Sequence, residues 1–264
     1  MSQPSADYAR DGVVAVRGAL DAAGLDLLRH ALDHAEQHPS PMASNLATSE
    51  DAYFFNDFNT WRKNPAVRQI MSDDALLSLA HDVVGTTTLR LFHDHVLVKR
   101  GMSKETPWHQ DRPYYLVAGP MNYSVWMSPE AVPRDEGLAF VAGSHLVPAL
   151  FVPVDFATGA MMQAPDWLEP LDDARLAELT AHLPIVGFDL EPGDALVFDN
   201  RIVHMARRSA AAVPRRALSI RYLGDGASLT WNGVNQTPPF HRMGLRFEEG
   251  DPPPDAWFPP LPHS

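Results

Sequence analysis

The stretch EPGDALVFDNRIVHMARRSAAAVPRRALSIRY, residues 191–222, is the part of the sequence that decides the fold. Its segment DALVFDN (194–200) is an apolar, β-prone run, and the Asp-Asn pair that ends the run is typical of a tight turn. The chain can then return as a second strand that carries His204, and a third β-rich run begins at Arg215. Short strands separated by turns predict a β-sandwich or a β-barrel.

The same pattern of short strands and turns extends upstream. Further β-rich runs are TTTLRLFHDHVLVKR (86–100), YSVWMSP (123–129) and GLAFVAGSH (137–145). We therefore expect a mainly β protein with helical additions, whose β core covers residues 89–236. An insertion at about 155–184 interrupts this core and contains a predicted helix, and a proline-rich extension follows over 237–264.

The N-terminal part, residues 1–88, is expected to be largely helical. It opens with a short strand in DGVVAVRGAL (11–20), after which Asp21 is positioned to cap a helix. Leucines and an alanine then recur at helical spacing, at Leu25, Leu28, Leu32 and Ala35.

A loop and two further helices complete this N-terminal part. The span from Ser40 to Lys63 mixes polar and aromatic residues without a clear period, which predicts a loop. The segment from Asn64 onward predicts two helical pieces, the second capped by Ser72 and ended by Gly85.

Composition and charge exclude several classes of function. The 264 residues include 21 basic and 33 acidic side chains, which gives a net charge of −12 and argues against a nucleic-acid or anionic membrane partner. The chain has no cysteine, so disulfides, a thiolate nucleophile and Cys-based zinc sites are excluded. We find no signal-peptide pattern and no apolar run long enough to span a bilayer. We expect a single cytoplasmic domain, monomeric or homodimeric, that acts on a small molecule.

The stretch TPWHQDRPYY (106–115) carries the most informative pair of side chains. In an extended chain, residues i and i+2 lie on one face, so His109 and Asp111 would converge while Trp108 and Gln110 point away. The pair alone is equally compatible with a surface hydrogen bond. With His204 from a second strand it forms a 2-His-1-carboxylate set, which binds non-haem Fe(II) and leaves coordination positions open.

An arginine at residue 215 or 216 could bind the far carboxylate of a 2-oxoglutarate chelated by such an iron. Alternation along RRALSIRY puts Arg215 on the smaller and more polar face, with Arg221, whereas Arg216 shares a face with large apolar residues. A guanidinium binds a carboxylate bidentately, so Arg215 is the candidate.

These motifs together resemble the phytanoyl-CoA dioxygenase family of Fe(II)- and 2-oxoglutarate-dependent oxygenases. The resemblance rests on five segments in order: DGVVAVRGAL, WHQD, VPRDEGLAFVAGSH, PGDALVFDNRIVH and RRALSIRYLGD. It implies a double-stranded β-helix, or jelly roll, with N-terminal helices packed on the major sheet. It also implies hydroxylation of an unactivated C–H bond with dioxygen, releasing succinate and CO2. The residues that match the family's iron ligands are His109, Asp111 and His204, and those that match its cosubstrate contacts are Arg215, Trp126 and Gln110.

One position departs from the family pattern. Many relatives have a serine two residues after the distal histidine, where this chain has Ala206, so the cosubstrate must find that hydrogen bond elsewhere. The presence of Asp111 favours hydroxylation over halogenation, because halogenating relatives lack this carboxylate. Desaturation and ring formation stay open, as does the identity of the substrate.

Further residues are predicted to line the pocket. Lys99 ends a strand near the cosubstrate and is predicted to assist its binding, with a solvated strand end as the alternative. The predicted substrate contacts are Tyr114, Tyr115, Arg221, His95 and Trp231, each with core packing or a structural ion pair as the alternative.

Two other functions fit the same ligand set. One is a cupin-type isomerase or hydrolase with a non-redox metal. The other is a binding module with a degenerate site. Arg215 discriminates the first from an oxygenase, because a non-redox site has no need to anchor a five-carbon diacid, and the retention of three ligands argues against the second.

Overall fold

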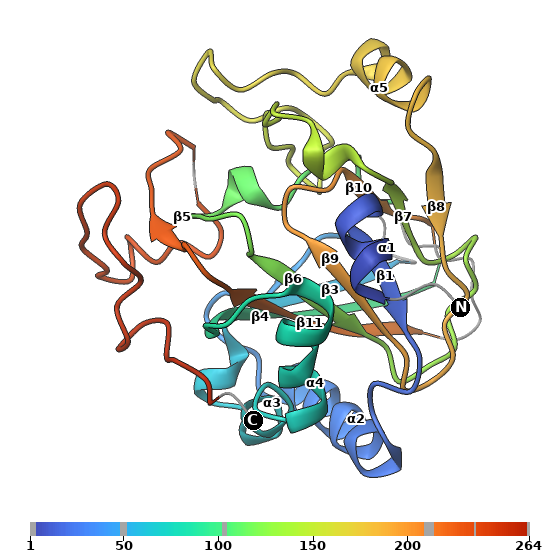
Figure 1. The fold of residues 1–264 in the computed structure, drawn as a ribbon. Helices are drawn as coiled ribbons and strands as arrows, with labels where there is room; N and C mark the ends of the chain where they lie inside the picture. Colours follow the sequence, from blue (N-terminus) through green and yellow to red (C-terminus); the bar gives the residue numbers. More distant parts are fainter. Residues whose placement is uncertain (1–3, 48–51, 102–104, 209–213, 235, 263–264) are drawn as a thin grey trace.

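A seven-stranded antiparallel sheet forms the centre of the structure, a computed structural model that describes residues 4–47, 52–101, 105–208, 214–234 and 236–262 (Figure 1). Its strands in spatial order are β1 (Val13–Val16), β9 (Ala195–Asp199), β6 (Tyr123–Met127), β11 (Arg215–Leu223), β4 (Arg90–Arg100), β3 (Tyr53–Phe58) and β2 (Ser44–Asn45). Successive side chains along these strands lie on opposite faces of the sheet. One face contacts the helices and the other faces a second sheet.

The second sheet has three antiparallel strands in the order β10, β7, β8. They are β10 (His204–Ala206), β7 (Leu138–Val141) and β8 (Ile185–Gly187). Apolar side chains from both sheets meet between them, among them Trp126 and Phe198 from the large sheet and Phe140 from the small one. Two antiparallel sheets facing one another in this way make the jelly roll expected from the sequence.

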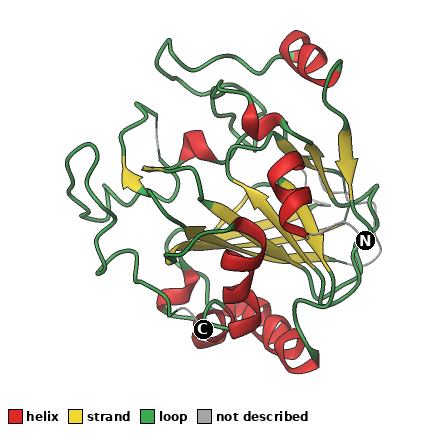
Figure 2. Ribbon diagram, viewed as in Figure 1, coloured by secondary structure: helices red, strands yellow, loops and turns green. Residues whose placement is uncertain are grey.

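Helices cover the outer face of the large sheet (Figure 2). They are α2 (Ala22–Gln37), α3 (Pro65–Ile70), α4 (Asp74–Leu79) and the π-helical turn η2 (Ala80–Val84), and α1 (Pro4–Asp11) precedes β1. Leu28 and Leu32 of α2 pack in one core with Val96 and Ile220 of the sheet. This packing confirms the predicted position of the N-terminal helices.

The caps of these helices agree with the sequence at two positions and differ at a third. Asp21 accepts a hydrogen bond from the Gly24 N–H at 2.8 Å, as expected of an N-cap. Gly85 ends η2 in the left-handed conformation, also as expected. The predicted cap Ser72 is wrong, because Asp73 accepts from the first-turn N–H groups of α4. A carboxylate at this position also faces the positive end of the helix dipole.

The predicted loop between Ser40 and Lys63 is also wrong. Within it, β3 pairs with β4 over six residues, β2 pairs with β3, and a 3-10 turn, η1 (Thr60–Arg62), follows. The polar residues that obscured the strand are buried with specific partners. Asn56 donates to the Ser44 hydroxyl at 2.6 Å, and Asp57 accepts from the Ser40 N–H at 2.7 Å.

The insertion and the C-terminal extension pack against the β core. The insertion contains the predicted helix as α5 (Asp173–Thr180), capped by Asp172. Smaller elements are η3 (Arg112–Tyr114), η4 (Ser144–Leu146), β5 (Val117–Ala118) and β12 (Ser228–Leu229). In the extension, Phe240 and Phe258 pack with Phe92 in a separate apolar cluster.

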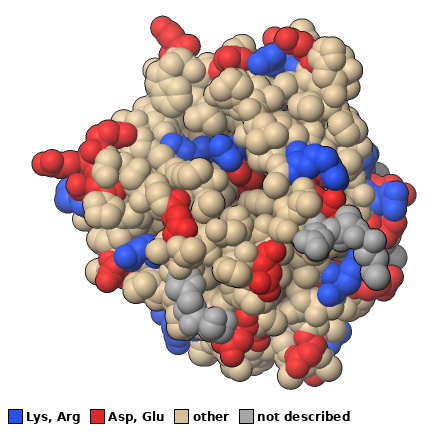
Figure 3. Space-filling view, viewed as in Figure 1, with Lys and Arg blue, Asp and Glu red and all other residues tan. Residues whose placement is uncertain are grey.

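The exterior carries charges of both signs. On the face in Figure 3, acidic and basic side chains lie among one another over a largely uncharged surface. Among the described residues, no helix combines the length and apolarity needed to cross a bilayer.

Candidate metal centre

Two histidines from distant parts of the chain lie side by side between the sheets. His109 and His204 form an antiparallel β-bridge, with backbone N···O distances of 2.9 and 2.8 Å. The Nδ1 atoms face carbonyl oxygens, that of Pro107 at 2.8 Å for His109 and that of Ile202 at 3.0 Å for His204. A carbonyl can only accept, so each Nδ1 carries the proton and each Nε2 keeps its lone pair.

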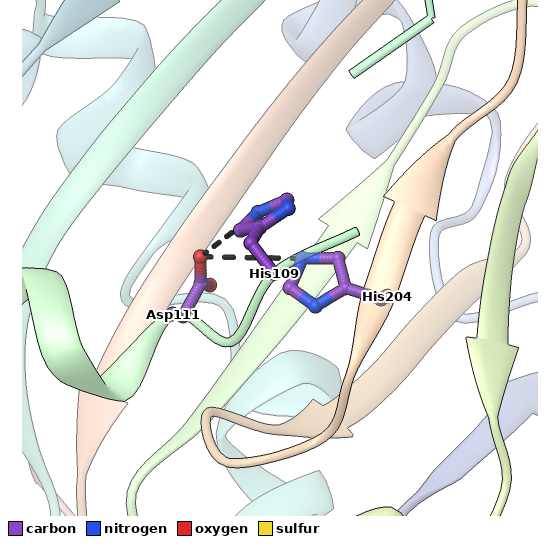
Figure 4. A group of neighbouring side chains, drawn as sticks. All are labelled: His109, Asp111 and His204. Atoms are coloured by element: carbon purple, nitrogen blue, oxygen red, sulfur yellow. Dashed lines mark ion pairs between the residues drawn. The ribbon is translucent and has the colours of Figure 1, made fainter. Parts of the chain in front are cut away.

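Asp111 completes the group. Its Oδ1 lies 3.8 Å from Nε2 of His109 and 4.0 Å from Nε2 of His204 (Figure 4). The segment is not a regular strand: His109 is held by the β-bridge, and Asp111 has helical torsions and begins η3. The two side chains converge all the same, because the bridge and the turn together aim them at one point. As expected, Trp108 points away and packs in another apolar cluster.

Burial fixes the charge state of this group. It lowers the pKa of His109 to about 3, with a further contribution from His204, and it also lowers the pKa of His204. For Asp111, burial alone would raise the pKa, but the Arg221 guanidinium and the two imidazoles hold it below its usual range. The result is two neutral imidazoles facing one carboxylate at neutral pH.

This donor set fits a divalent transition metal. The three ligand atoms lie within 4.8 Å of one another and all three residues are buried. Metal binding needs deprotonated ligands, and the tautomers and the low carboxylate pKa provide them without a proton having to leave. Two imidazoles and one carboxylate on one side of a metal leave positions opposite them for other ligands.

The group opens into a cavity of about 300 Å³ between the sheets. Strand β11 runs along it, with Arg221 beside Asp111 and Arg215 six residues away on the same face. Arg216 lies on the opposite face, where it pairs with Glu130 and with Asp33 of α2. The structure therefore places Arg215 in the cavity and Arg216 against the helices.

Two basic side chains that line the cavity, Arg215 and Lys99, lie opposite one another on neighbouring strands. Arg215 and Lys99 are direct partners in the β11 and β4 pairing, and both are buried. Burial, with repulsion from Arg215, lowers the pKa of Lys99 to about 7, and burial lowers that of Arg215 to about 10. Arg215 donates to the carbonyl oxygens of Glu136 and Arg207. Two positive charges this close repel one another and destabilise the folded protein. A bound anion between them would make the same arrangement favourable.

Thr106 provides a hydroxyl beside Ala206. Its Oγ1 accepts from the Ala206 N–H at 2.6 Å, and its N–H donates to the Ala206 carbonyl at 2.9 Å. Thr106 and Trp126 line the cavity with Arg215. Because Oγ1 accepts from the backbone, its own proton remains to be donated into the cavity.

Aromatic side chains form the wall beside the metal centre. The Phe156 ring lies 4.6 Å from that of His109 in an edge arrangement, and the His95 ring stacks on Phe58 at 4.0 Å. The Tyr114 hydroxyl donates to the Val154 carbonyl at 2.7 Å and accepts from the Val154 N–H at 2.8 Å. Tyr114 thus fastens the start of the insertion over the histidines.

Most of the sequence-predicted site residues meet in this cavity, and two do not. The predicted residues that line it are His95, Lys99, His109, Asp111, Tyr114, Tyr115, Trp126, His204, Arg215 and Arg221. Gln110 is turned away, and its amide bonds to the backbone of Ala149, Phe151 and Arg201. Trp231 is half exposed and contacts His241.

Several cavity residues were missed by sequence reasoning. They are Thr106, Phe156, and Asn56 and Phe58 of β3, whereas Met162 was considered only as a residue of a covering loop. Thr106 stands three residues before His109, a proximity that could have indicated it. Phe156 and Met162 lie in the insertion, whose position after the β-rich run of β7 was visible, but the sequence does not indicate which of its side chains turn inward.

Comparison with known proteins agrees with this geometry. The family model for phytanoyl-CoA dioxygenase (PhyH) matches residues 8–217. A search of curated proteins returned no match.

Solved structures resemble the whole chain. The epimerase SnoN, in complex with Fe3+, alpha ketoglutarate and nogalamycin RO, aligns with a TM-score of 0.78 at 23% identity, covering 98% of this chain and 97% of its own. The carbocyclase SnoK from nogalamycin biosynthesis aligns with 0.76 at 20% identity, covering 99% and 97%. EctD from S. alaskensis, with 2-oxoglutarate and 5-hydroxyectoine, aligns with 0.72 at 18% identity, covering 96% and 85%. At these identities the likeness establishes a shared fold.

Proposed function

The chain belongs to the phytanoyl-CoA dioxygenase family, and from this premise we propose that it is an Fe(II)- and 2-oxoglutarate-dependent oxygenase. We propose further that it hydroxylates an unactivated C–H bond of a small molecule and releases succinate and CO2. The observation that carries the proposal is the presence, in one cavity, of a three-ligand centre and a buried pair of cations.

The proposed ligands of the iron are His109, Asp111 and His204. Their Nε2 atoms and Oδ1 point at a common centre, and the hydrogen bonds on Nδ1 keep the imidazoles in the required tautomer. When bound, Fe(II) with 2-oxoglutarate and dioxygen supplies the oxidising power that a C–H bond demands.

The proposed site for the far carboxylate of 2-oxoglutarate is the cation pair. Arg215 would bind it through its planar guanidinium, and Lys99 would add charge. The Thr106 hydroxyl, beside Ala206, is proposed to supply the hydrogen bond that a serine makes in many relatives. Such a pair supports an oxygenase over a non-redox metal enzyme, which has no diacid to hold.

The remaining cavity wall supports a substrate with an apolar face. Phe58, Tyr114 and Phe156 form this wall, and the insertion that Tyr114 fastens would exclude water from the reacting carbon. Asp111 occupies the position that a halide would need, which supports hydroxylation.

Anaerobic reconstitution tests the proposal. The metal-free protein would be mixed with Fe(II) and 2-oxoglutarate, and the weak visible band of the chelated keto acid recorded. We expect the band in the wild type and in Arg216→Gln, the matched control, and we expect Arg215→Gln to need at least tenfold more 2-oxoglutarate, because a charged hydrogen bond is worth about 1.5–3 kcal/mol.

A wild-type protein that binds iron without giving the band would contradict the proposal. If the band forms, candidate small molecules would then be screened by succinate release under air, which also separates hydroxylation from other outcomes once the product is analysed.

A further inference from the structure

Arg221 is buried beside the metal centre with its guanidinium bound on three sides. Its Nε donates to the Tyr115 hydroxyl at 2.8 Å, one Nη donates to the Ser219 carbonyl at 3.2 Å, and the other faces Oδ2 of Asp111 at 3.4 Å. These contacts direct the guanidinium toward a metal ligand and its neighbours.

The two oxygens of Asp111 consequently have different surroundings. Oδ1 faces the Nε2 atoms of the two histidines, as Figure 4 shows. Oδ2 faces Arg221. The Tyr115 hydroxyl, which accepts from Arg221, lies near the Asp111 carboxylate and contributes to lowering its pKa. The protein thus binds one side of the carboxylate and leaves the other side to the metal.

This asymmetry matters because a carboxylate can bind a metal through one oxygen or two. An octahedral metal with two imidazoles, one carboxylate oxygen and two keto-acid atoms has one position left. A carboxylate bound through both oxygens would fill that position, and dioxygen would have no place to bind.

We propose that Arg221 and Tyr115 are positioning residues that restrict Asp111 to binding through Oδ1 and so keep one coordination position open. The inference rests on the proposed function, because it concerns the metal of that site. Neither residue touches the metal; both act through Asp111.

The two residues are well placed to hold a fixed geometry. Arg221 lies within β11, which is paired on both sides, by β4 and by β6. Tyr115 follows η3, the turn that Asp111 begins, and its ring packs against Phe92 and His93. Asp111 is therefore held by Arg221, which lies in a central strand, and by Tyr115, whose ring is packed. Its carboxylate has little freedom to rotate toward a second metal contact.

Two variants and two matched controls test this role. Tyr115→Phe removes a single hydroxyl, and Arg221→Gln removes the charge. Tyr222→Phe is the matched control for the tyrosine, because its buried hydroxyl bonds to the Met71 carbonyl on the helix-facing side. Arg216→Gln is the control for the arginine, and far-UV circular dichroism would check folding in all four.

Two measurements read the metal centre without turnover. Mn(II) affinity would be titrated by electron paramagnetic resonance, and nitric oxide would be added anaerobically to the Fe(II) and 2-oxoglutarate complex as a probe of the open position. We expect Mn(II) binding to weaken about tenfold or more in Tyr115→Phe and Arg221→Gln, as for other residues that orient metal ligands. We also expect their nitric oxide signal to fall while the keto-acid band persists and the controls match the wild type.

Each outcome decides the question. Wild-type values in Tyr115→Phe for both measurements would overturn the proposal, even if Arg221→Gln does not fold. Weaker Mn(II) binding with an unchanged nitric oxide signal would overturn the claim of an open position. A wild type without the keto-acid band would refute the proposed function instead, while the Mn(II) titration would still decide whether Arg221 and Tyr115 orient Asp111.

Discussion

Replacing Lys99 by Met is expected to stabilise the ligand-free protein at pH 6 and to weaken 2-oxoglutarate binding. Lys99 is 3% exposed and stands opposite Arg215, so its charge is unfavourable in the folded state and well solvated in the unfolded chain. Methionine fills a similar volume without charge. Activity and stability therefore change in opposite directions.

The magnitude follows from the pKa of Lys99, which falls from 10.5 to about 7 on folding. At 1.36 kcal/mol for each pH unit, the protonated amine lowers the free energy of unfolding by about 5 kcal/mol. The amine nitrogen lies 4.3 Å from the centre of the Phe54 ring, and this cation–π contact stabilises the folded protein by about 1 kcal/mol. The amine has a further interaction that Lys99→Met also removes, so the net gain expected at pH 6 is smaller than this balance, on the order of 2 kcal/mol.

The sign of the pH dependence is fixed by the same shift. Below pH 7 the amine is protonated in both the folded and the unfolded state. The free energy of unfolding is then lowered by the full amount given above. Between pH 7 and 10.5 the unfolded chain binds more protons than the folded one, so the stability of the wild type rises with pH. The advantage of Lys99→Met should shrink over this range and vanish above it.

Urea unfolding of the two proteins at pH 6, 7, 8, 9 and 10 would measure the difference. The exposed Lys63→Met variant is the control, because it removes a lysine charge that lies outside the cavity. Saturating 2-oxoglutarate should stabilise the wild type more than Lys99→Met if the bound anion pairs with the amine as proposed. A Lys99→Met protein less stable than wild type at pH 6, or a gap independent of pH, would refute the reasoning.

Three further predictions concern the same cavity. His204→Gln should lose high-affinity Fe(II) binding, measured by metal content after dialysis; full retention of iron would exclude this ligand. Thr106→Val should weaken 2-oxoglutarate binding about tenfold, the worth of one hydrogen bond, whereas Thr106→Ser should bind as the wild type does; titration of the visible band compares them. Tyr114→Phe leaves the Val154 N–H and carbonyl without their hydroxyl partner, so amide hydrogen exchange at 153–162 should speed up, and unchanged exchange would show that the hydroxyl does not fasten the insertion.

The candidate metal centre could be located from the sequence because its geometry follows largely from local rules. His109 and Asp111 are two residues apart, and a strand, a turn and a second strand return His204 toward them. Even here the local conformation differed from the expectation, since Asp111 has helical torsions as the N-cap of η3 instead of lying in a strand. The spacing predicted that the two side chains converge, but it did not predict the backbone conformation that brings them together.

Strand β3 could not be predicted, because its partners are remote. Asn56 and Asp57 read as loop residues, but both are buried and hydrogen bonded to Ser44 and Ser40. Thr106, Phe156 and the contact between Arg221 and Asp111 likewise depend on tertiary neighbours. The alternation of polar and apolar residues and the residues typical of turns predict the local backbone conformation. They do not predict which distant side chains will come into contact.

The position of β2 and β3 at the margin of the large sheet has a consequence for altering this protein. Ser44, Asn56 and Phe58 contribute to the cavity wall, yet β2 has a neighbour on one side only. Variation in β2 disturbs a single ladder of backbone bonds and leaves the proposed iron ligands, which come from other segments, untouched. A mutant library for new substrates is therefore best concentrated on residues 44–46, which include the cavity residues Ser44 and Leu46.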